Sequence, residues 1–241
     1  MNATIRIDFK PKESDLINIT DWLYAEYVKT KTGFYCNMNI IKTCFDENRM
    51  VIILVNKYAV GFITWAFNTS YSAEIVIAEI HPAFRKFGYG KILANHLFSH
   101  FIKNNILTVD LECAPANSVH FWKKFKFKEF PKDERWERPN LELYKILVEC
   151  QKPNVIKDTE SEIIELWNGE PSETRDRLPD WQWEIKYKKG LNQLTKSIIF
   201  PCKYDWRIRW RKGDKVIYDE KVKRFNNNKI SYGKYLILEN L

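Results

Sequence analysis

The stretch HPAFRKFGYGKIL, residues 81–93, holds two glycines one residue apart, preceded by a proline and two cations and followed by an apolar run. Gly88 and Gly90 let the backbone approach a ligand closely. A helix that begins there also offers unpaired N–H groups with a partial positive charge. Such a turn favours an anion, most often a phosphate group. We therefore predict an anion-binding turn ahead of a helix.

Two common phosphate-binding motifs do not fit this stretch. Leu93 occupies the place of the third glycine in the dinucleotide fingerprint, and the Gly-x-x-x-x-Gly-Lys-Ser/Thr spacing of nucleotide hydrolases is absent. A tight turn without a ligand is the simpler interpretation of an isolated Gly-x-Gly. The surrounding sequence decides between them.

The first 149 residues alternate between strand and helix patterns. Apolar residues at helical spacing predict helices from about residue 14, at 37–45, after the glycine turn and at 117–125. Strand patterns cover 4–10, 50–55, 58–67, 72–80, 107–113 and 140–149. The order is strand, two helices, three strands, helix, strand, helix, strand. It predicts an α/β fold with a mixed, mainly antiparallel sheet flanked by helices.

The run from Ile80 through Arg85-x-x-Gly88-x-Gly90 into an apolar helix resembles the acetyl-CoA signature of the GNAT N-acetyltransferase superfamily. Asn117, followed by FWKKFKF at 121–127, resembles a later motif of that family, and the element order of residues 1–149 is similar to the family's. The resemblance implies that an acetyl group passes from acetyl-CoA, as co-substrate, to a primary amine by direct attack.

The resemblance also implies which residues contact the cofactor. The backbone at 78–80 would face the pantetheine arm and thioester, residues 86–91 would wrap the pyrophosphate, and the segment from Asn117 would lie near the cofactor's other side. The implied contacts are Ala78, Glu79, Ile80, Arg85, Lys86, Phe87, Gly88, Tyr89, Gly90, Lys91, Asn117 and Trp122.

The sequence departs from the family pattern at four positions. Lys86 and Phe87 stand where small and basic residues are usual, and Lys126 replaces the later glycine. Trp122 takes the place of the tyrosine that protonates the departing thiolate, and an indole cannot give up its proton in that way. Tyr89 or water would then have to substitute.

Three glutamates could activate the amine. Glu74 resembles the base of the family's histone-acetylating branch, and Glu112 resembles that of the ribosomal-protein N-terminal branch. Glu79 is the third, and each could instead be a solvated strand carboxylate. Glu74 and Glu79 are five positions apart, so a regular strand would point them to opposite faces, with at most one facing the thioester.

The pattern changes near residue 151. With the family resemblance, this predicts an acetyl-CoA-binding N-acetyltransferase domain at 1–150, a linker with a short helix at 151–180, and a small antiparallel β domain at 181–241. A capping-box pattern at Thr159 and Glu162 predicts the helix. The β domain is expected to help choose or cover the substrate, or to bind a partner. Alternating tryptophans predict its core: Trp181, Trp183, Trp206 and Trp210.

The positive net charge and one arginine-rich segment bear on whether the protein binds an acidic partner. The 241 residues carry a net charge of +8 without a long basic run. Arg207, Arg209 and Arg211 alternate along one predicted strand, either as a solvated face or as a cationic ridge for nucleic-acid phosphates. The alternative to an enzyme is thus a catalytically weak acyl-CoA-binding protein whose basic β domain holds an acidic macromolecule.

Other features predict a cytoplasmic protein without metal or membrane. Five scattered cysteines form no Cys-x-x-Cys pair, and His96 and His100 have no third ligand beside them. The N-terminus lacks a signal-peptide core, and the longest aliphatic run, 50–55, is too short to span a bilayer. The acceptor's class and the oligomeric state are not predicted.

Overall fold

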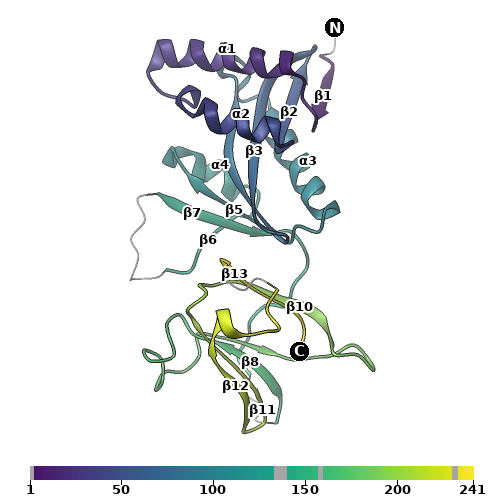
Figure 1. The fold of residues 1–241 in the computed structure, drawn as a ribbon, viewed down its shortest axis with the longest axis vertical. Coiled ribbons are helices and arrows are strands. Elements are labelled where there is room, and N and C mark those ends of the chain that lie inside the picture. Colours follow the sequence, from purple (N-terminus) through teal and green to yellow (C-terminus); the bar gives the residue numbers. More distant parts are fainter. Residues whose placement is uncertain (1–2, 133–139, 157–159, 230–232) are drawn as a thin grey trace. The chain divides into compact units, whose positions relative to one another are not determined.

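The structure is a computed structural model that describes residues 3–132, 140–156, 160–229 and 233–241 (Figure 1). It divides into two compact units, Met1–Glu112 and Cys113–Leu241. The predicted catalytic domain of residues 1–150 is a different division, made by family resemblance, and it stays a prediction.

The strands of the first unit form the predicted mixed sheet. They are β1 (Ile5–Asp8), β2 (Met50–Val55), β3 (Tyr58–Thr69), β4 (Ser72–Ile80) and β5 (Thr108–Cys113). Neighbours from β1 to β4 pair antiparallel, and β5 pairs parallel to β4. Strands β6 (Lys128–Glu129) and β7 (Leu141–Ile146) pair antiparallel and belong to the second unit. The predicted fold class is confirmed.

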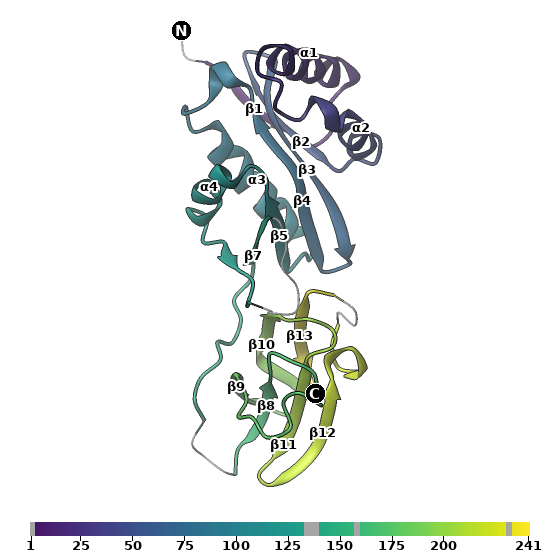
Figure 2. The ribbon, with the colours of Figure 1, turned by 90° about the vertical axis from the view of Figure 1, so that its left-hand side faces the viewer.

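Helices cover both faces of the strands in the first unit (Figure 2). They are α1 (Glu13–Thr30), α2 (Met38–Asp46) and α3 (Tyr89–Lys103), with short 3-10 turns η1 (Tyr35–Asn37) and η2 (Pro82–Phe84). Trp22 of α1 and Ile41 of α2 share one core with Phe62 of β3. On the other face, Phe101 of α3 meets Trp65 edge-on, with ring centroids 5.6 Å apart. Because both faces are covered, β2 is apolar and buried throughout.

The second unit contains the predicted small antiparallel β structure. It begins with η3 (Ala116–Ser118) and α4 (Val119–Lys123) and includes the later turn η4 (Val222–Arg224). Its later strands are β8 (Glu162–Leu166), β9 (Trp181–Glu184), β10 (Gln193–Pro201), β11 (Arg207–Lys212), β12 (Lys215–Lys221) and β13 (Tyr235–Asn240). They form a four-stranded sheet, β12-β11-β8-β9, and a β10-β13 pair. Strand β10 was not predicted.

Tryptophans fill the core of this β structure, as predicted. Trp183 and Trp206 are buried, and Trp181 stacks on Trp206 with ring centroids 5.6 Å apart. Trp210 packs against the same core from a partly buried position. Aromatic side chains on alternating positions give a small sheet the large apolar area that it needs to bury.

The helix predicted around residues 159–167 is wrong, because Glu162–Leu166 is strand β8. Thr159 of the expected capping box lies outside the described residues. Strand β8 pairs with both β11 and β9. Apolar residues at 163, 164, 166 and 167 fit a helix as well as a strand buried on both faces, so periodicity could not separate the two. The predicted linker therefore contains a central strand.

The arginines of β11 are paired inside the second unit. Arg207 is buried and donates from Nε and Nη2 to the two carboxylate oxygens of Asp219, both at 2.6 Å. Arg209 and Arg211 both donate from Nε to Glu165, at 2.6 and 3.3 Å. The prediction of an exposed cationic ridge or solvated face is therefore wrong for these side chains.

Within the part of the chain that the structure describes, no helix is both long enough and apolar enough to cross a membrane.

Candidate functional site

Strand β4 contains a bulge at Val76. Two consecutive residues of β3 pair with Ile77 and then with Ile75, so Val76 has no residue opposite it. The pairing of β4 with β5 stops at the same level, because Ile75 opposite Leu111 is the last pair in register, although β4 continues to Ile80. A bulge bends its strand and disrupts the ladder locally. The second half of β4 is thus left without β5 along one edge.

The bulge also changes which face the carboxylates of β4 occupy. Glu74 lies opposite Ala66 of β3, and Glu79 lies opposite Phe62. Residues directly opposite each other point to one face, and positions four apart on a strand share a face. Glu74 and Glu79 therefore lie on the same face. The prediction of opposite faces is wrong, because the extra residue at Val76 shifts the alternation by one.

The third predicted carboxylate lies on this face as well. The parallel register places Glu74 beside Asp110 of β5, and Glu112 is two residues further along β5. Asp110 is buried, whereas Glu112 is exposed. All three candidate bases thus share the face on which Phe62 packs against α1 and α2.

The open edge of β4 presents main-chain donors. His81 N–H donates to the carbonyl of Val60 in β3 at 2.9 Å. Because successive amides of a strand point to opposite edges, the N–H groups of Ala78 and Ile80 point away from β3. Ile80 N–H donates to Oε1 of the neighbouring Glu79 at 2.9 Å. A main-chain donor on the predicted cofactor strand is therefore covered by an acidic side chain.

The glycine turn leads directly into α3. Gly88 precedes the helix with a φ of +85°, and a Cβ added there would meet nothing within 4 Å. No side chain caps the helix, and the first intrahelical bond runs from Ile92 N–H to the Gly88 carbonyl at 3.1 Å. The amides at residues 89–91 therefore have no intrahelical partners. Lys86 and Lys91 are exposed beside them.

Two departures from the family motifs keep a backbone conformation that glycine favours. Lys86 has a φ of +70°, and Lys126 has a φ of +66°. A residue with a Cβ pays about 1–2 kcal/mol for this left-handed conformation. Lys86 and Lys126 thus hold a conformation that glycine would adopt at lower cost. Phe87, between Lys86 and Gly88, is 69% exposed.

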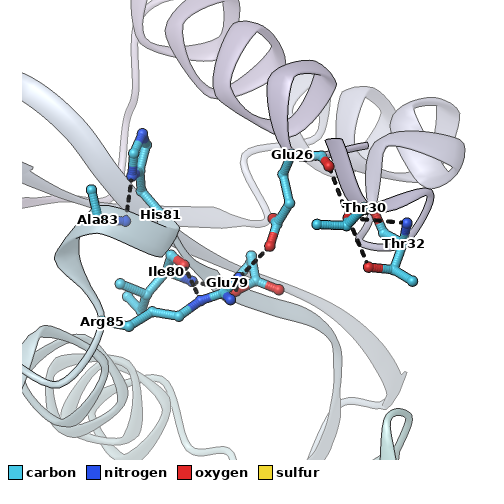
Figure 3. Close-up of polar contacts among 8 residues, drawn as sticks. All are labelled: Glu26, Thr30, Thr32, Glu79, Ile80, His81, Ala83 and Arg85. Atoms are coloured by element: carbon cyan, nitrogen blue, oxygen red, sulfur yellow. Dashed lines mark hydrogen bonds and ion pairs between the residues drawn. The ribbon is translucent and has the colours of Figure 1, made fainter. Parts of the chain in front are cut away.

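Arg85 is held by two carboxylates at the end of β4 (Figure 3). Its Nη2 contacts Oε1 of Glu26 at 2.7 Å and Oε1 of Glu79 at 3.1 Å, and its Nε donates to the Ile80 carbonyl at 3.0 Å. Glu26 comes from α1, 59 residues away along the chain. With these partners inside the first unit, the predicted contact of Arg85 with the diphosphate stays a prediction.

Burial shifts the titration of two groups in this cluster. It raises the pKa of the Glu79 carboxyl, against the opposing effect of the Arg85 charge, and the negative charge of Glu26 adds to the rise. Burial also lowers the pKa of the His81 imidazole. The neutral ring suits its contact, because Nδ1 accepts a hydrogen bond from Ala83 N–H at 3.1 Å and thereby caps η2.

The family motif beyond residue 113 lies in the second unit. Asn117 belongs to η3, and its side chain lies outside the described part of the structure. Trp122 of α4 is buried and packs on Phe121 and Phe127, with ring centroids 4.9 and 5.4 Å away. Trp122 is therefore a packing residue of this segment. The predicted cofactor contacts of Asn117 and Trp122 stay predictions.

Sequence reasoning missed Glu26 and the bulge. Glu26 lies on α1 within no motif, and its partners are 53 and 59 residues away, so local patterns carry no signal for it. The bulge sits in an apolar run, EIVIAEI, in which any residue could have been the extra one. Only the strand register identifies Val76.

Comparison with known proteins gives a family and several similar folds. Residues 16–127 match the model of the acetyltransferase (GNAT) family. No curated protein matches the chain. The PaiA N-acetyltransferase from Thermoplasma acidophilum, solved with coenzyme A, is 20% identical over 59% of this chain and 99% of its own, with a TM-score of 0.46.

Two further structures are similar at the same level. A GNAT-family acetyltransferase from Bacillus cereus is 18% identical over 61% of this chain and 99% of its own, with a TM-score of 0.48. N-acetylglutamate synthase from Neisseria gonorrhoeae is 14% identical over 62% of this chain and 36% of its own, also with a TM-score of 0.48. The family match and the mixed sheet agree, and residues 16–127 form a domain of the GNAT acetyltransferase family.

Proposed function

We propose that the protein transfers an acetyl group from acetyl-CoA to a primary amine by direct attack. One observation carries the proposal: within one compact unit, the unpaired edge of β4 runs into a glycine turn with uncapped helix amides. The first feature suits an extended thioester arm, and the second suits a diphosphate. The family of residues 16–127 supports the same reading.

The residues present fit the coenzyme. A diphosphate at the start of α3 would meet the amides of residues 89–91 and the positive end of the helix dipole. Lys86 and Lys91 are exposed beside the turn and would add two positive charges. The Ala78 and Ile80 N–H groups are placed to donate to carbonyl oxygens of an arm lying along β4.

Acetyl-CoA supplies an activated acetyl thioester to this chemistry. A neutral amine forms the new C–N bond, the C–S bond breaks, and coenzyme A leaves as a thiolate. The nitrogen gives up two protons in all, one of which ends on the sulfur and the other in solvent. A main-chain N–H on the open edge of β4 would stabilise the oxyanion that develops on the carbonyl oxygen.

Removing the first proton is the costly step. An alkyl amine with a pKa of about 10.4 is neutral in only about one molecule in 2,500 at pH 7, so a base contributes strongly. We propose Glu74 and Glu112 as the candidate bases. Glu74 is half-buried and Glu112 exposed, and both lie on one face of the sheet. Tyr89, half-buried at the start of α3, or water would protonate the thiolate.

The alternative, a binding protein for an acidic macromolecule, loses the support expected from β11. Arg207 is paired with Asp219, and Arg209 and Arg211 share Glu165, so each of the three arginines has a carboxylate partner within the unit. An acidic or nucleic-acid partner therefore stays a prediction that rests on net charge alone.

Calorimetry with acetyl-CoA, followed by a thiol-release assay over a panel of amines, tests the proposal. We expect binding, and thiol release with at least one primary amine. The variants E74Q and E112Q, measured separately, should identify the base as the one whose loss lowers kcat by about 10²–10⁴ while the Kd for acetyl-CoA is kept. Binding without release from any amine would favour the binding protein, and no binding would contradict both readings.

A further inference from the structure

We propose that Glu79, held by Arg85, which also contacts Glu26, binds the acceptor as a primary ammonium ion, and that acetyl-CoA frees Glu79 for this role by taking the Ile80 amide. The inference rests on the proposed acetyl transfer and adds the acceptor's class, the residue that selects it and the order of binding.

The first step is the state of the Glu79 carboxylate. Its Oε1 accepts hydrogen bonds from Ile80 N–H at 2.9 Å and from Arg85 Nη2 at 3.1 Å. Its Oε2 accepts none from the residues that the structure describes. The side chain is 16% exposed, so the carboxylate is largely desolvated but not sealed off. One oxygen is fixed, and the other is available to a ligand.

The second step is competition for one amide. Ile80 N–H points to the open edge of β4, where a carbonyl oxygen of the coenzyme's arm or thioester would also accept it. When a carbonyl oxygen of the coenzyme accepts the Ile80 N–H, Glu79 retains the hydrogen bond from Arg85 and loses the one from Ile80. A largely buried carboxylate that loses a donor gains from a new one. A primary ammonium offers three N–H donors and a full positive charge.

The third step is a negative charge that the cluster does not balance. Two carboxylates, Glu26 and Glu79, share one guanidinium. The Glu26 side chain is only 10% exposed, and its Oε2 is buried without a hydrogen-bond partner among the described residues. Figure 3 shows Glu26 reaching from α1 toward Glu79 and Arg85. A monovalent cation at Glu79 would bring the three side chains to neutrality.

The charges around Glu79 set the acceptor's chemistry. Glu26 faces it from α1, Arg85 from the turn, and Glu74 shares its face of β4, while burial keeps His81 neutral near pH 7. The one cation is already engaged by two carboxylates. An acceptor with a carboxylate beside its amine would be repelled here, whereas an alkylammonium ion would not. The site is therefore expected to favour amines without an adjoining carboxylate.

The experiment compares two matched acceptors, propylamine and 2-aminobutanoate, which differ by one carboxylate on the carbon that bears the amine. In thiol-release kinetics, wild-type protein should show a kcat/KM at least 10-fold higher for propylamine. Glu79→Gln should raise the KM for propylamine at least 10-fold and change kcat less than 3-fold. Its Kd for CoA should be unchanged or lower, since the amide is less strongly held by a neutral side chain.

Glu26→Gln should raise the same KM by less, because Glu26 contacts Arg85 and would act on the ammonium only through the charge of this cluster. Glu13→Gln is the matched control: it removes an exposed carboxylate from the same helix, and it should leave the KM unchanged. Calorimetry should also show propylamine binding at least 10-fold more tightly to CoA-saturated protein than to free protein.

An unchanged KM for propylamine in E79Q would overturn the inference. If E79Q also bound CoA more weakly, the role of Glu79 would be purely structural. A preference for 2-aminobutanoate would overturn it too. Failure of the proposed function looks different: wild-type protein would then release no thiol with any amine, and this inference would fall with it.

Discussion

Two strands of this molecule carry charged side chains on one face, and the structure treats them differently. The arginines of β11 form closed hydrogen bonds within their own unit, because both carboxylate oxygens of Asp219 and of Glu165 accept from them. The carboxylate Glu79 near the end of β4 is in an open cluster: it shares Arg85 with Glu26 of α1, and the Glu26 Oε2 has no hydrogen-bond partner among the described residues. Whether charged side chains on a strand are open to a ligand is thus better predicted from their hydrogen-bond partners than from their charge.

The largest expected effect tests the closed side of this comparison. Arg207→Ala would leave Asp219 without its guanidinium and remove the cation that lies 4.4 Å from the Trp167 ring centroid. Arg207 is buried but Asp219 is exposed, so the expected loss of about 2 kcal/mol of unfolding free energy comes from the charged hydrogen bonds and the packing of the arginine itself. Urea unfolding followed by tryptophan fluorescence measures it. Arg175→Ala, at an exposed arginine of the same unit, should change little.

If Arg207→Ala lost less than about 1 kcal/mol, the arginines of β11 would be ordinary surface charges. The hydrogen bonds of β11 would then not distinguish its arginines from the open cluster at Glu79, and the comparison would be wrong.

A middle-sized effect is expected at the glycine turn. Gly88→Ala places a Cβ at a φ of +85°, which costs about 1–2 kcal/mol although the space is open. Gly190→Ala is its matched control, because Gly190 has a φ of +74°, is equally open and lies in the second unit. Both variants should lower the thermal midpoint by similar amounts. Only Gly88→Ala should also weaken CoA binding in calorimetry, by up to about 10-fold, because a free turn that relaxes to relieve about 1.4 kcal/mol of strain must recover its shape on binding.

Equal CoA affinities in the two glycine variants would show that the coenzyme does not depend on the turn at Gly88. Unequal thermal shifts alone would concern only the local packing of each turn.

The smallest expected effect concerns pH. Burial lowers the pKa of His81, so the folded state favours the neutral ring. Its contribution to stability is fully present above the ordinary pKa of 6.5 and is lost as pH falls through the lower folded value. Protonation removes the Nδ1 acceptor that caps η2 ahead of the glycine turn. Between pH 7.5 and 5.5, CoA affinity should therefore fall a few-fold more in wild type than in His81→Asn.

Asparagine keeps an acceptor oxygen for the Ala83 amide but does not titrate. Protonation of the coenzyme's own phosphates affects both proteins equally, so it does not change the ratio of variant to wild-type affinity. A constant ratio across this range would mean that the His81 cap has no part in coenzyme binding.

Much of the first unit could be predicted because its signals are local. The elements from β1 to β5 and the turn at Gly88 follow from periodicity and from glycines at positive φ. The shared face of Glu74 and Glu79 could not be predicted, because one extra residue at Val76 reverses the alternation without leaving a mark in composition. Glu26 could not be found either, since its partner Arg85 is 59 residues away.

The second unit shows the same limit. Its tryptophans predict a β core correctly, because alternating aromatics need one shared face to bury. Strand β8 was predicted as a helix, since a strand apolar on both faces has no period of two. Whether the arginines of β11 were exposed depended on Glu165 in that same strand. The error about β8 therefore accounts for the error at Arg209 and Arg211, whereas the partner of Arg207 is Asp219 of β12.

The central claim is that the amides at the start of α3 bind a diphosphate and thereby lay the thioester arm along the open edge of β4. Calorimetric titration of wild-type protein with CoA and with pantetheine, which lacks the diphosphate, tests it most directly. We predict that CoA binds at least 100-fold more tightly, and that the difference shrinks in Gly88→Ala but not in Gly190→Ala. Equal affinities for CoA and pantetheine in the wild-type protein would contradict the account.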